Sequence, residues 1–413
     1  INKFGGYMND RLYAELIVNK ALNIKDGSIL RIRANTENLP FAREVARMAY
    51  EKGAAEVKVD IKDEAIERLN MEHMSEERLE HFGKYNLDEA VDYAEDGCFY
   101  LSITGGDPDL FKGIDPKRIA MRSKAAGKVM KPSMKYTMND MNSWCVVGYP
   151  TVKWAKKVFP DLSDDEAVKK LKEAIFKTVR LDREDPFAAW DEHLEKLESR
   201  GKKLNELQLD RLHYTTKRGT DLTIGLPENH VWMGAVSEDD RKNIFLPNLP
   251  TEEIFTAPDK NRIDGVVYST KPLNLSGTIV DEFKVVFEKG KAVEVSAKHG
   301  EQNLKDLIKT DENASSLGEV ALVSVESPIN RSGLIFMNTL FDENASCHLA
   351  FGAAYPTCLK GGDKMTDEEL DKHGINDSQI HVDFMVGDET LEIVGYDKEG
   401  KEYKIFENGD FVI

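Results

Sequence analysis

The hydrophobic pattern of the chain changes near residue 207, and this change most limits the folds open to it. Before that point, helical runs alternate with short buried strands. From Leu207 onward, short β-prone runs dominate, and several are joined by tight turns. Alternating strands and helices are typical of parallel sheets, whereas runs joined by short turns pair as antiparallel hairpins. We therefore predict an α/β protein with an N-terminal βαβ-type parallel-sheet domain, residues 1–215, and a C-terminal α+β domain rich in β-hairpins, residues 216–413.

The N-terminal region predicts a βαβ unit. Apolar spacing indicates a first helix, and a strand, a second helix and a second strand follow it, at residues 11–22, 28–33, 39–52 and 56–59. By the usual handedness these two strands form a parallel pair. A further buried strand, residues 98–104, ends at the turn Gly105-Gly106-Asp107-Pro108. This turn lacks the glycine spacing of a dinucleotide fingerprint and continues with acidic residues, so we expect no nucleotide site there.

Local signals predict two helices and two hairpins further along the chain. Ser163 and Glu166 form a capping box ahead of a helix to Lys177, and Asp185-Pro186 begins a charged helix that should end at Arg200-Gly201. Hairpins are predicted at residues 283–297 and 391–406, with turns at 288–291 and 397–400.

His381 and Asp383 stand two residues apart in an apolar, β-prone run from Ile380 to Val386. Side chains two apart on a strand point to the same face, so both groups can reach one metal ion. Alternation alone predicts instead that the polar residues of such a strand face water. The pair therefore indicates a metal site only together with other ligands.

Glu343 and His348 form a second candidate pair, with Asn344, Ala345 and Ser346 between them. This spacing predicts a turn that enters a helix, and ligands on either side of a helix start can converge on one ion. Cys347 lies beside them, but oxygen and nitrogen donors predominate in hydrolytic two-metal sites. We therefore expect Cys347 to be a small buried apolar residue.

Glu319 is a third candidate ligand. It follows a predicted helical stretch, residues 304–317 with a break near Asn313, and opens an apolar strand, residues 320–325. A carboxylate there must be paired, protonated or metal-bound, since burying it bare is costly, and a salt bridge at the strand end is an equal alternative. Two divalent cations would neutralise the four candidate carboxylates, Glu253, Glu319, Glu343 and Asp383.

Four phrases that contain these residues resemble the aminopeptidase T and aminopeptidase S family of two-metal exopeptidases. They are NLPTEEIFTAP at 248–258, LGEVALV at 317–323, FDENASCHL at 341–349 and IHVDFMVG at 380–387. Further similarity, including KKVFPDL at 156–162 and GTDLTIGLPE at 219–228, extends the resemblance over nearly the whole chain. Four motifs in the family's order make the match specific.

The resemblance implies six metal ligands, with Glu319 as the bridge: Glu253, Glu319, Glu343, His348, His381 and Asp383. It also implies that Tyr355 lies close to the ions, where its phenol would ligate weakly or donate a hydrogen bond to the oxyanion, although a tyrosine before a proline is commonly a packed turn residue. Glu252 is a candidate general base, because adjacent carboxylates can divide metal binding and proton transfer between them. If Glu252 lies on a strand it points away from Glu253, and Glu319 or a metal hydroxide takes that role.

Composition limits the partners. With 413 residues, of which 41% are hydrophobic, the chain can bury a substantial core. Its net charge of -18 argues against nucleic acid or an anionic membrane as a partner and favours cationic ligands such as the free amino terminus of a peptide.

The cysteines and the N-terminal residues bear on location. Four scattered cysteines without a C-x-x-C pair indicate a reducing compartment. The sequence has no apolar run long enough to span a membrane, and residues 1–11 lack the apolar core of a signal peptide. We therefore expect a cytoplasmic protein.

The function expected is removal of the N-terminal residue from peptides at two divalent ions, and Zn, Co, Mn and Mg all suit such ligands. One ion would hold the free α-amine, the other would hold the scissile carbonyl oxygen, and a metal-activated water would attack. The resemblance also implies a homodimer whose internal cavity admits short peptides. The alternatives are a two-metal phosphoesterase, for which only Arg331 and Lys360 are nearby cations, and a non-catalytic metal- or peptide-binding protein.

Overall fold

The computed structural model describes residues 5–275 and 278–413, which pack as two compact units. Unit 1 comprises the residues as far as Asp191 together with Val236–Pro250, and unit 2 comprises Glu192–Ala235 and Thr251–Ile413. The units are defined by packing, so the domain boundary predicted between residues 215 and 216 stays a prediction. Unit 1 contains a parallel sheet and unit 2 contains antiparallel sheets, which confirms the predicted fold class.

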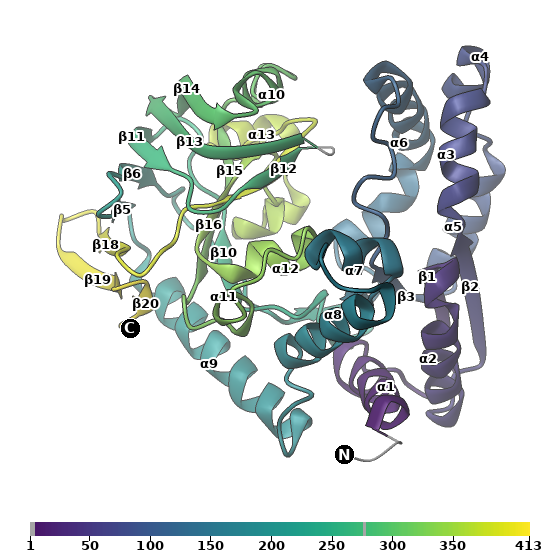
Figure 1. Cartoon of the computed structure of the whole chain (residues 1–413). Helices are drawn as coiled ribbons and strands as arrows, with labels where there is room; N and C mark the ends of the chain where they lie inside the picture. The colour runs from purple at the N-terminus through teal and green to yellow at the C-terminus, as the bar shows by residue number, and fades with distance from the viewer. Residues whose placement is uncertain (1–4, 276–277) are drawn as a thin grey trace. The chain divides into compact units, whose positions relative to one another are not determined.

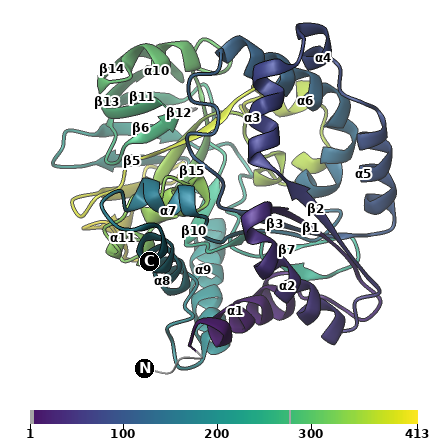
Figure 2. The same ribbon diagram turned by 45° about the vertical axis from the view of Figure 1, so that its right-hand side comes forward.

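Unit 1 is built on a parallel sheet of five strands in the order β2-β1-β3-β4-β9. Apolar side chains at alternate positions of β1, such as Leu30 and Ile32, are fully buried, as the period of a strand requires. Helix α2 connects β1 to β2 and packs beside both strands (Figure 1), so the predicted βαβ unit is confirmed. Figure 2 shows β1, β2 and β3 side by side. The strands are β1 Ile29–Asn35, β2 Glu56–Lys62, β3 Phe99–Thr104, β4 Trp144–Gly148 and β9 Asn248–Leu249.

The other elements of unit 1 are mainly helices. Helix α8 begins with the predicted capping box, in which the Ser163 N–H donates to the Glu166 carboxylate at 3.3 Å. After β3, the Asp107 N–H donates to the Glu64 carboxylate at 3.1 Å, so an acidic side chain occupies the turn. The helices are α1 Gly5–Leu16, which continues as a π-helical turn Ile17–Ala21, α2 Leu39–Glu51, α3 Glu64–His73, α4 Glu76–Glu80, α5 Tyr85–Glu95, α6 Pro116–Met138, α7 Val152–Val158 and α8 Asp164–Thr178. A short ribbon pairs β7 Ser237–Glu238 with β8 Ile244–Phe245.

Helix α9, Pro186–Leu207, begins where predicted but passes through Gly201, so the end predicted there is wrong. Its start is capped by Asp185, whose carboxylate accepts the Ala188 N–H at 3.0 Å. Leu197 and Leu204 lie on either side of Gly201 and are almost fully buried in the core of unit 2. Their burial outweighs the roughly 1 kcal/mol that glycine costs inside a helix.

Unit 2 holds two antiparallel sheets. The larger, of nine strands, has the order β12-β13-β11-β6-β5-β18-β19-β20, with β14 paired to β13. Both predicted hairpins are confirmed in it: Glu288 pairs with Lys291 in one and Tyr396 with Glu402 in the other. Helix α10 lies beside β13 and β14 (Figure 1). The strands are β5 Arg211–Thr215, β6 Asp221–Gly225, β11 Ile263–Tyr268, β12 Leu273–Leu275, β13 Thr278–Glu288, β14 Lys291–His299, β18 Glu392–Tyr396, β19 Glu402–Glu407 and β20 Asp410–Phe411.

The helical stretch predicted over residues 304–317 is wrong beyond its first turn. Helix α10, Glu301–Leu307, ends early, and the chain then folds around Asp311. The Asp311 carboxylate accepts the N–H groups of Asn313 and Gln379 at 2.9 and 2.8 Å, an alternative to helical hydrogen bonds that short acidic side chains favour. Among the helices of the described residues, none is both long and apolar enough to cross a membrane.

Candidate metal centre

The four-stranded antiparallel sheet of unit 2 carries the candidate ligands. Its order is β10-β15-β16-β17, with bounds Glu253–Thr256, Leu317–Val323, His348–Gly352 and His381–Met385. Side chains alternate between its faces, and one face consists of apolar residues packed in the main core of unit 2. That face includes Ile254, Val320, Leu322, Leu349, Phe351 and Phe384.

The opposite face gathers candidate ligands from all four strands. Register places Ala350 directly between Glu319 on β15 and Asp383 on β17, and Gly352 opposite His381. Cross-strand neighbours on one face have Cβ atoms only about 4.5–5.5 Å apart. The small residues among the ligands therefore leave room above the sheet, where the long side chains converge.

Glu319 stands at the centre of this cluster. One of its carboxylate oxygens lies 3.4 Å from His348 Nε2 and the other lies 3.5 Å from His381 Nε2. Glu253 approaches the same atom of His348 at 3.3 Å, and Asp383 approaches the same atom of His381 at 3.4 Å. The part of the chain that the structure describes thus contains two groups of candidate ligands, Glu253-Glu319-His348 and Glu319-His381-Asp383. Each group presents three ligand atoms that lie within 4.8 Å of one another, and Glu319 belongs to both.

Both imidazoles are held with Nε2 toward the carboxylates. His381 Nδ1 lies 2.7 Å from the carbonyl oxygen of Ala353, and His348 Nδ1 lies 3.3 Å from that of Ser346. A backbone carbonyl at Nδ1 selects the tautomer with its proton there and leaves the Nε2 lone pair free for a cation. This is the usual arrangement of a metal-binding histidine.

Gly318 allows β15 to approach the end of β16. The register shifts between Leu317 and Glu319, and a Cβ added at Gly318 would lie 2.3 Å from the carbonyl oxygens of Gly352 and Ala353. Only glycine fits so close to two backbone atoms. The Ala353 carbonyl that holds His381 therefore depends on the absence of a side chain at residue 318.

Glu343 lies close enough to the cluster to interact electrostatically with Asp383 and Glu253, although it is outside both three-ligand groups. Helix α12, Thr339–Asp342, leads into a 3₁₀ turn at Glu343–Ala345, and His348 then begins β16. The predicted turn into a helix is therefore wrong: the helix comes first and a strand follows. The convergence of Glu343 and His348 arises because helix and strand meet at this corner.

Burial raises the pKa values of Glu319 and Glu343, whereas in Asp383 burial is outweighed by the hydrogen bond and charge of His381, which lower the pKa. In Glu319 the hydrogen bond from His348 offsets only part of the rise in pKa. In Glu343, burial and then the charges of Asp383 and Glu253 raise the pKa well above its ordinary value. Protonation is thus one way for this acidic cluster to reduce its charge, and cation binding is another.

The imidazoles respond to the same charges. Burial lowers the pKa of His348, but its hydrogen bonds to Glu253 and Glu319 outweigh burial and hold the pKa well above its ordinary value. In His381 burial is again outweighed, here by the hydrogen bond and charge of Asp383, and the pKa rises to about 9. Such sites exchange protons for metal ions, because ligands bind deprotonated. The donor set of carboxylate oxygens and oriented imidazole nitrogens fits divalent cations.

Tyr355 lies at the edge of the cluster. Its ring makes edge-to-face contacts with the rings of His381, at 5.4 Å between centroids, and Phe255, at 5.8 Å. Although Tyr355 is 39% exposed, desolvation beside the cluster and the negative charges of Glu319 and Asp383 raise the pKa of its phenol. The phenol therefore keeps its proton and is available as a donor.

Glu252 is buried immediately before β10, and its carboxylate lies 3.6 Å from Nε2 of His193 on α9. The same nitrogen lies 2.9 Å from the Thr251 carbonyl oxygen. The Glu252 N–H donates to the side-chain oxygen of Asn344 at 2.7 Å. His193 and Asn344 thus hold residues 251 and 252, which immediately precede Glu253. The sequence predicted neither of these two contacts.

Cys347 takes no part in the cluster. Its sulfur exchanges hydrogen bonds with the backbone of Val323 at 3.4 Å, it belongs to the main core, and burial raises its pKa to about 12. The expectation that it is a buried apolar residue is confirmed. Arg331, a candidate phosphate ligand, forms an ion pair with Glu326 instead.

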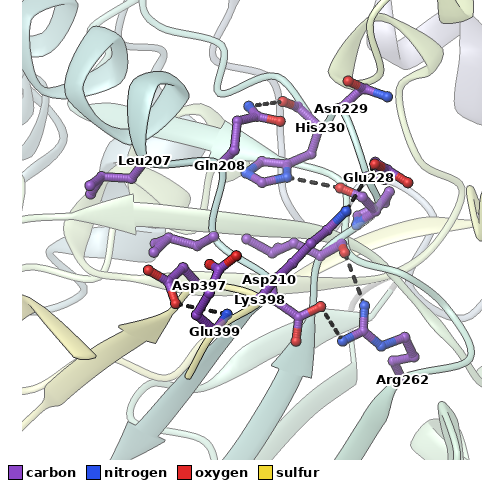
Figure 3. Close-up of a pocket in the computed structure, with 13 residues that line it drawn as sticks. Leu207, Gln208, Asp210, Glu228, Asn229, His230, Arg262, Asp397, Lys398 and Glu399 are labelled. Atoms are coloured by element: carbon purple, nitrogen blue, oxygen red, sulfur yellow. Dashed lines mark hydrogen bonds and ion pairs between the residues drawn. The ribbon is translucent and has the colours of Figure 1, made fainter. Parts of the chain in front are cut away.

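Unit 2 also contains a polar pocket of about 550 Å³, in which no metal-cluster residue takes part. Figure 3 shows two ion pairs among its charged side chains, Lys398 with Glu228 and Arg262 with Asp210, each at 2.8 Å. Asp397 and Glu399 also line the pocket, so its lining keeps a net negative charge.

Comparisons with known proteins show similarity over nearly the whole chain. Residues 9–411 match a family described as thermophilic metalloprotease (M29). Aminopeptidase AmpS of Bacillus subtilis (strain 168) is 44% identical over 399 residues, which cover 97% of each protein. Aminopeptidase T of Thermus aquaticus is 39% identical over 400 residues, again covering 97% of each. The solved structure of wild-type AmpT from Thermus thermophilus has a TM-score of 0.93 and 37% identity, and covers 98% of this chain and 100% of that chain.

Proposed function

Since the chain belongs to the thermophilic metalloprotease (M29) family and is a metal-dependent aminopeptidase, we propose that it removes the N-terminal residue of short peptides at a centre for two divalent ions. The observation that carries this proposal is the position of Glu319, whose two oxygens face two oriented imidazoles. A carboxylate shared in this way is suited to bridge two cations.

The proposed ligands divide around Glu319. Glu253 and His348 would bind on one side and His381 and Asp383 on the other, while Glu343 would complete the set from the corner between α12 and β16. Zn, Co, Mn and Mg all accept such donors, and the native metal is an open part of the proposal. When bound, two such ions polarise a carbonyl oxygen and make water nucleophilic at neutral pH.

Tyr355 would stabilise charge that develops on the substrate's carbonyl oxygen. Its hydroxyl stays protonated because local desolvation and the nearby carboxylates raise its pKa. A phenol positioned beside the reacting carbonyl can donate a hydrogen bond that strengthens as the oxygen becomes negative. Its ring contact with His381 supports this position at the edge of the cluster.

The general base would be Glu252 or Glu319. Glu252 is held close to His193, which gives it a partner with which to exchange a proton. Glu319 lies at the centre of the cluster, with its oxygens 3.4 and 3.5 Å from the two imidazoles. We propose that either Glu252 or Glu319 carries the proton to the leaving amine. A Glu252→Gln variant separates them, because metal content should survive this change whereas kcat should fall only if Glu252 moves the proton.

The net charge of -18 favours a substrate with a positive charge, and the α-ammonium of a peptide supplies one. We further propose a cytoplasmic homodimer that encloses its active sites and so admits only short peptides. The four cysteines are all free thiols, which supports a reducing compartment.

The test uses leucine p-nitroanilide and its N-acetylated form. The protein is stripped with a chelator and then supplied with Zn, Co, Mn or Mg, and a Glu319→Gln variant serves as the control. Activity restored by metal on the free amine alone is the expected result. Equal turnover of the acetylated substrate, or activity that survives chelation, would contradict the proposal. Sedimentation velocity tests the dimer, and a monomer that is fully active would overturn that part.

A further inference from the structure

Partly exposed apolar side chains border one side of the metal centre. Phe255 lies on β10 two residues after Glu253, on the same face of the sheet. Register places Ala321 directly between Phe255 and His348, so a small residue separates the phenylalanine from a proposed ligand. The opposite face of β10 holds Ile254, which is fully buried, whereas Phe255 is only half-buried.

Aromatic rings connect Phe255 to the cluster. The ring of Phe255 contacts the ring of Tyr355, and Tyr355 contacts His381, in two edge-to-face pairs with centroids 5.8 and 5.4 Å apart. Aromatic pairs at such distances are favourable and orient one another. The three rings therefore form a continuous wall beside the metal centre.

More apolar side chains extend this wall. A small core of Ala257, Cys358, Leu359 and Ile375 is covered by five partly buried residues, which are Met233, Phe255, Ala354, Met365 and Leu370. Two of these, Met365 and Leu370, lie in the charged segment of residues 360–371, and Asp371 anchors that segment through an ion pair with Lys260 at 2.5 Å. This segment thus contributes apolar surface to the neighbourhood of the site.

The chemistry of the reaction brings the substrate's first side chain close to this wall. The side chain branches from the carbon atom between the α-amine and the scissile carbonyl, and both of these groups must lie at the ligand face of the sheet. The small cavity on the other side, about 90 Å³ beside Asp383 and Met385, is lined by Leu273, Ile279, Ile335 and Met337 as well as by Asp342 and Asn338, so its wall is mixed. Phe255 is half-buried and Tyr355 is 39% exposed, so an apolar side chain that covers the aromatic wall removes apolar area from water.

We propose that Phe255 forms the wall of the subsite for the substrate's N-terminal side chain and selects large aliphatic and aromatic residues over alanine. This inference rests on the proposed function. Phe255 acts through contact with the substrate's side chain, outside the reacting atoms, so its loss changes selectivity and leaves the hydrolysis itself intact.

The experiment compares alanine, leucine and phenylalanine p-nitroanilides with wild type, Phe255→Ala and the matched control Ile254→Val. We expect Phe255→Ala to reduce kcat/KM for the leucine and phenylalanine substrates about 10-fold relative to alanine, near the lower end of what one apolar group discriminates. The loss should appear mainly in KM, because the contact is made equally in ground and transition states. The control reaches only the core face and should change no substrate ratio.

Metal content, measured by mass spectrometry, and thermal unfolding accompany each variant. An equal loss for all three substrates with metal retained, or unchanged ratios, would overturn the inference and assign selectivity to the cavity beside Asp383. If Phe255→Ala does not fold, Phe255→Leu keeps an apolar side chain without the ring, and it should lower the preference for phenylalanine over leucine. Failure of the wild type to cleave any free-amine substrate would refute the proposed function instead.

Discussion

Replacing Gly318 with alanine should weaken metal binding without touching a ligand. The added Cβ would lie 2.3 Å from the carbonyl oxygens of Gly352 and Ala353, so those backbone atoms must move. Ala353 accepts the hydrogen bond from His381 at 2.7 Å, and Gly352 accepts one from Asn376 at 2.6 Å. Overpacking of this kind costs about 1–3 kcal/mol of stability, and loss of a group that orients a metal ligand lowers affinity about 10–100-fold.

The assay is competition for metal against a chromogenic chelator, together with urea unfolding of the metal-free protein. Gly234→Ala is the matched control, because a Cβ there meets no atom within 4 Å and the residue lies in the same unit. The control should bind metal as the wild type does. Wild-type affinity and stability in Gly318→Ala would show that the Ala353 carbonyl does not set the position of His381, and the reasoning would fail.

Three further changes test other parts of the site. Tyr355→Phe should retain its metal but lower kcat by about 10²–10³, as the loss of one oxyanion donor does; an unchanged kcat in steady-state assays would make Tyr355 a packing residue. Glu319→Gln should lose both ions in metal analysis, because both groups of ligands contain it, and retention of one tightly bound ion would refute a bridging role. The pKa of His381 in the metal-free protein is raised to about 9, so its contribution to stability is complete below about pH 6.5 and is lost as the pH rises through 9, roughly 3 kcal/mol in all. Chemical unfolding of chelated protein should show this decline, whereas metal-loaded protein, in which the imidazole is neutral, should not.

Local sequence signals predicted individual elements well where side chain and backbone interact directly. The capping box of Ser163 and Glu166 and the two hairpin turns are of this kind, because a few neighbouring residues determine each. The end of α9 depended on tertiary packing. Leu204 is buried in the core of unit 2, and the local sequence around Gly201 does not indicate that burial. The order of the strands also required contacts between distant residues, which periodicity does not specify.

The candidate site shows the same division. The spacing of His381 and Asp383 correctly placed both on one face of a strand, and their side chains do approach each other. The family resemblance, confirmed by the comparisons, supplied the relation among ligands from four different strands. Asn344 and His193 were not predicted because both contact the backbone next to Glu252, and such contacts leave no spacing pattern in the sequence. The one available signal was the position of Asn344 directly after the candidate ligand Glu343.

Alternation along a strand normally assigns polar residues to water, and this sheet shows why that rule fails here. Glu253, Glu319 and His348 are only 7%, 5% and 1% exposed, so the centre of the ligand face is buried as well as the apolar face. The apolar face stabilises the fold by removing hydrocarbon from water, while the ligand face opposes folding, because uncompensated buried charges are costly. Even with both imidazoles protonated, four carboxylates exceed two positive charges, so protons alone leave the cluster acidic unless the carboxyl groups are protonated as well. Divalent cations remove that excess without changing any side chain, and their binding therefore contributes to folding as well as to catalysis.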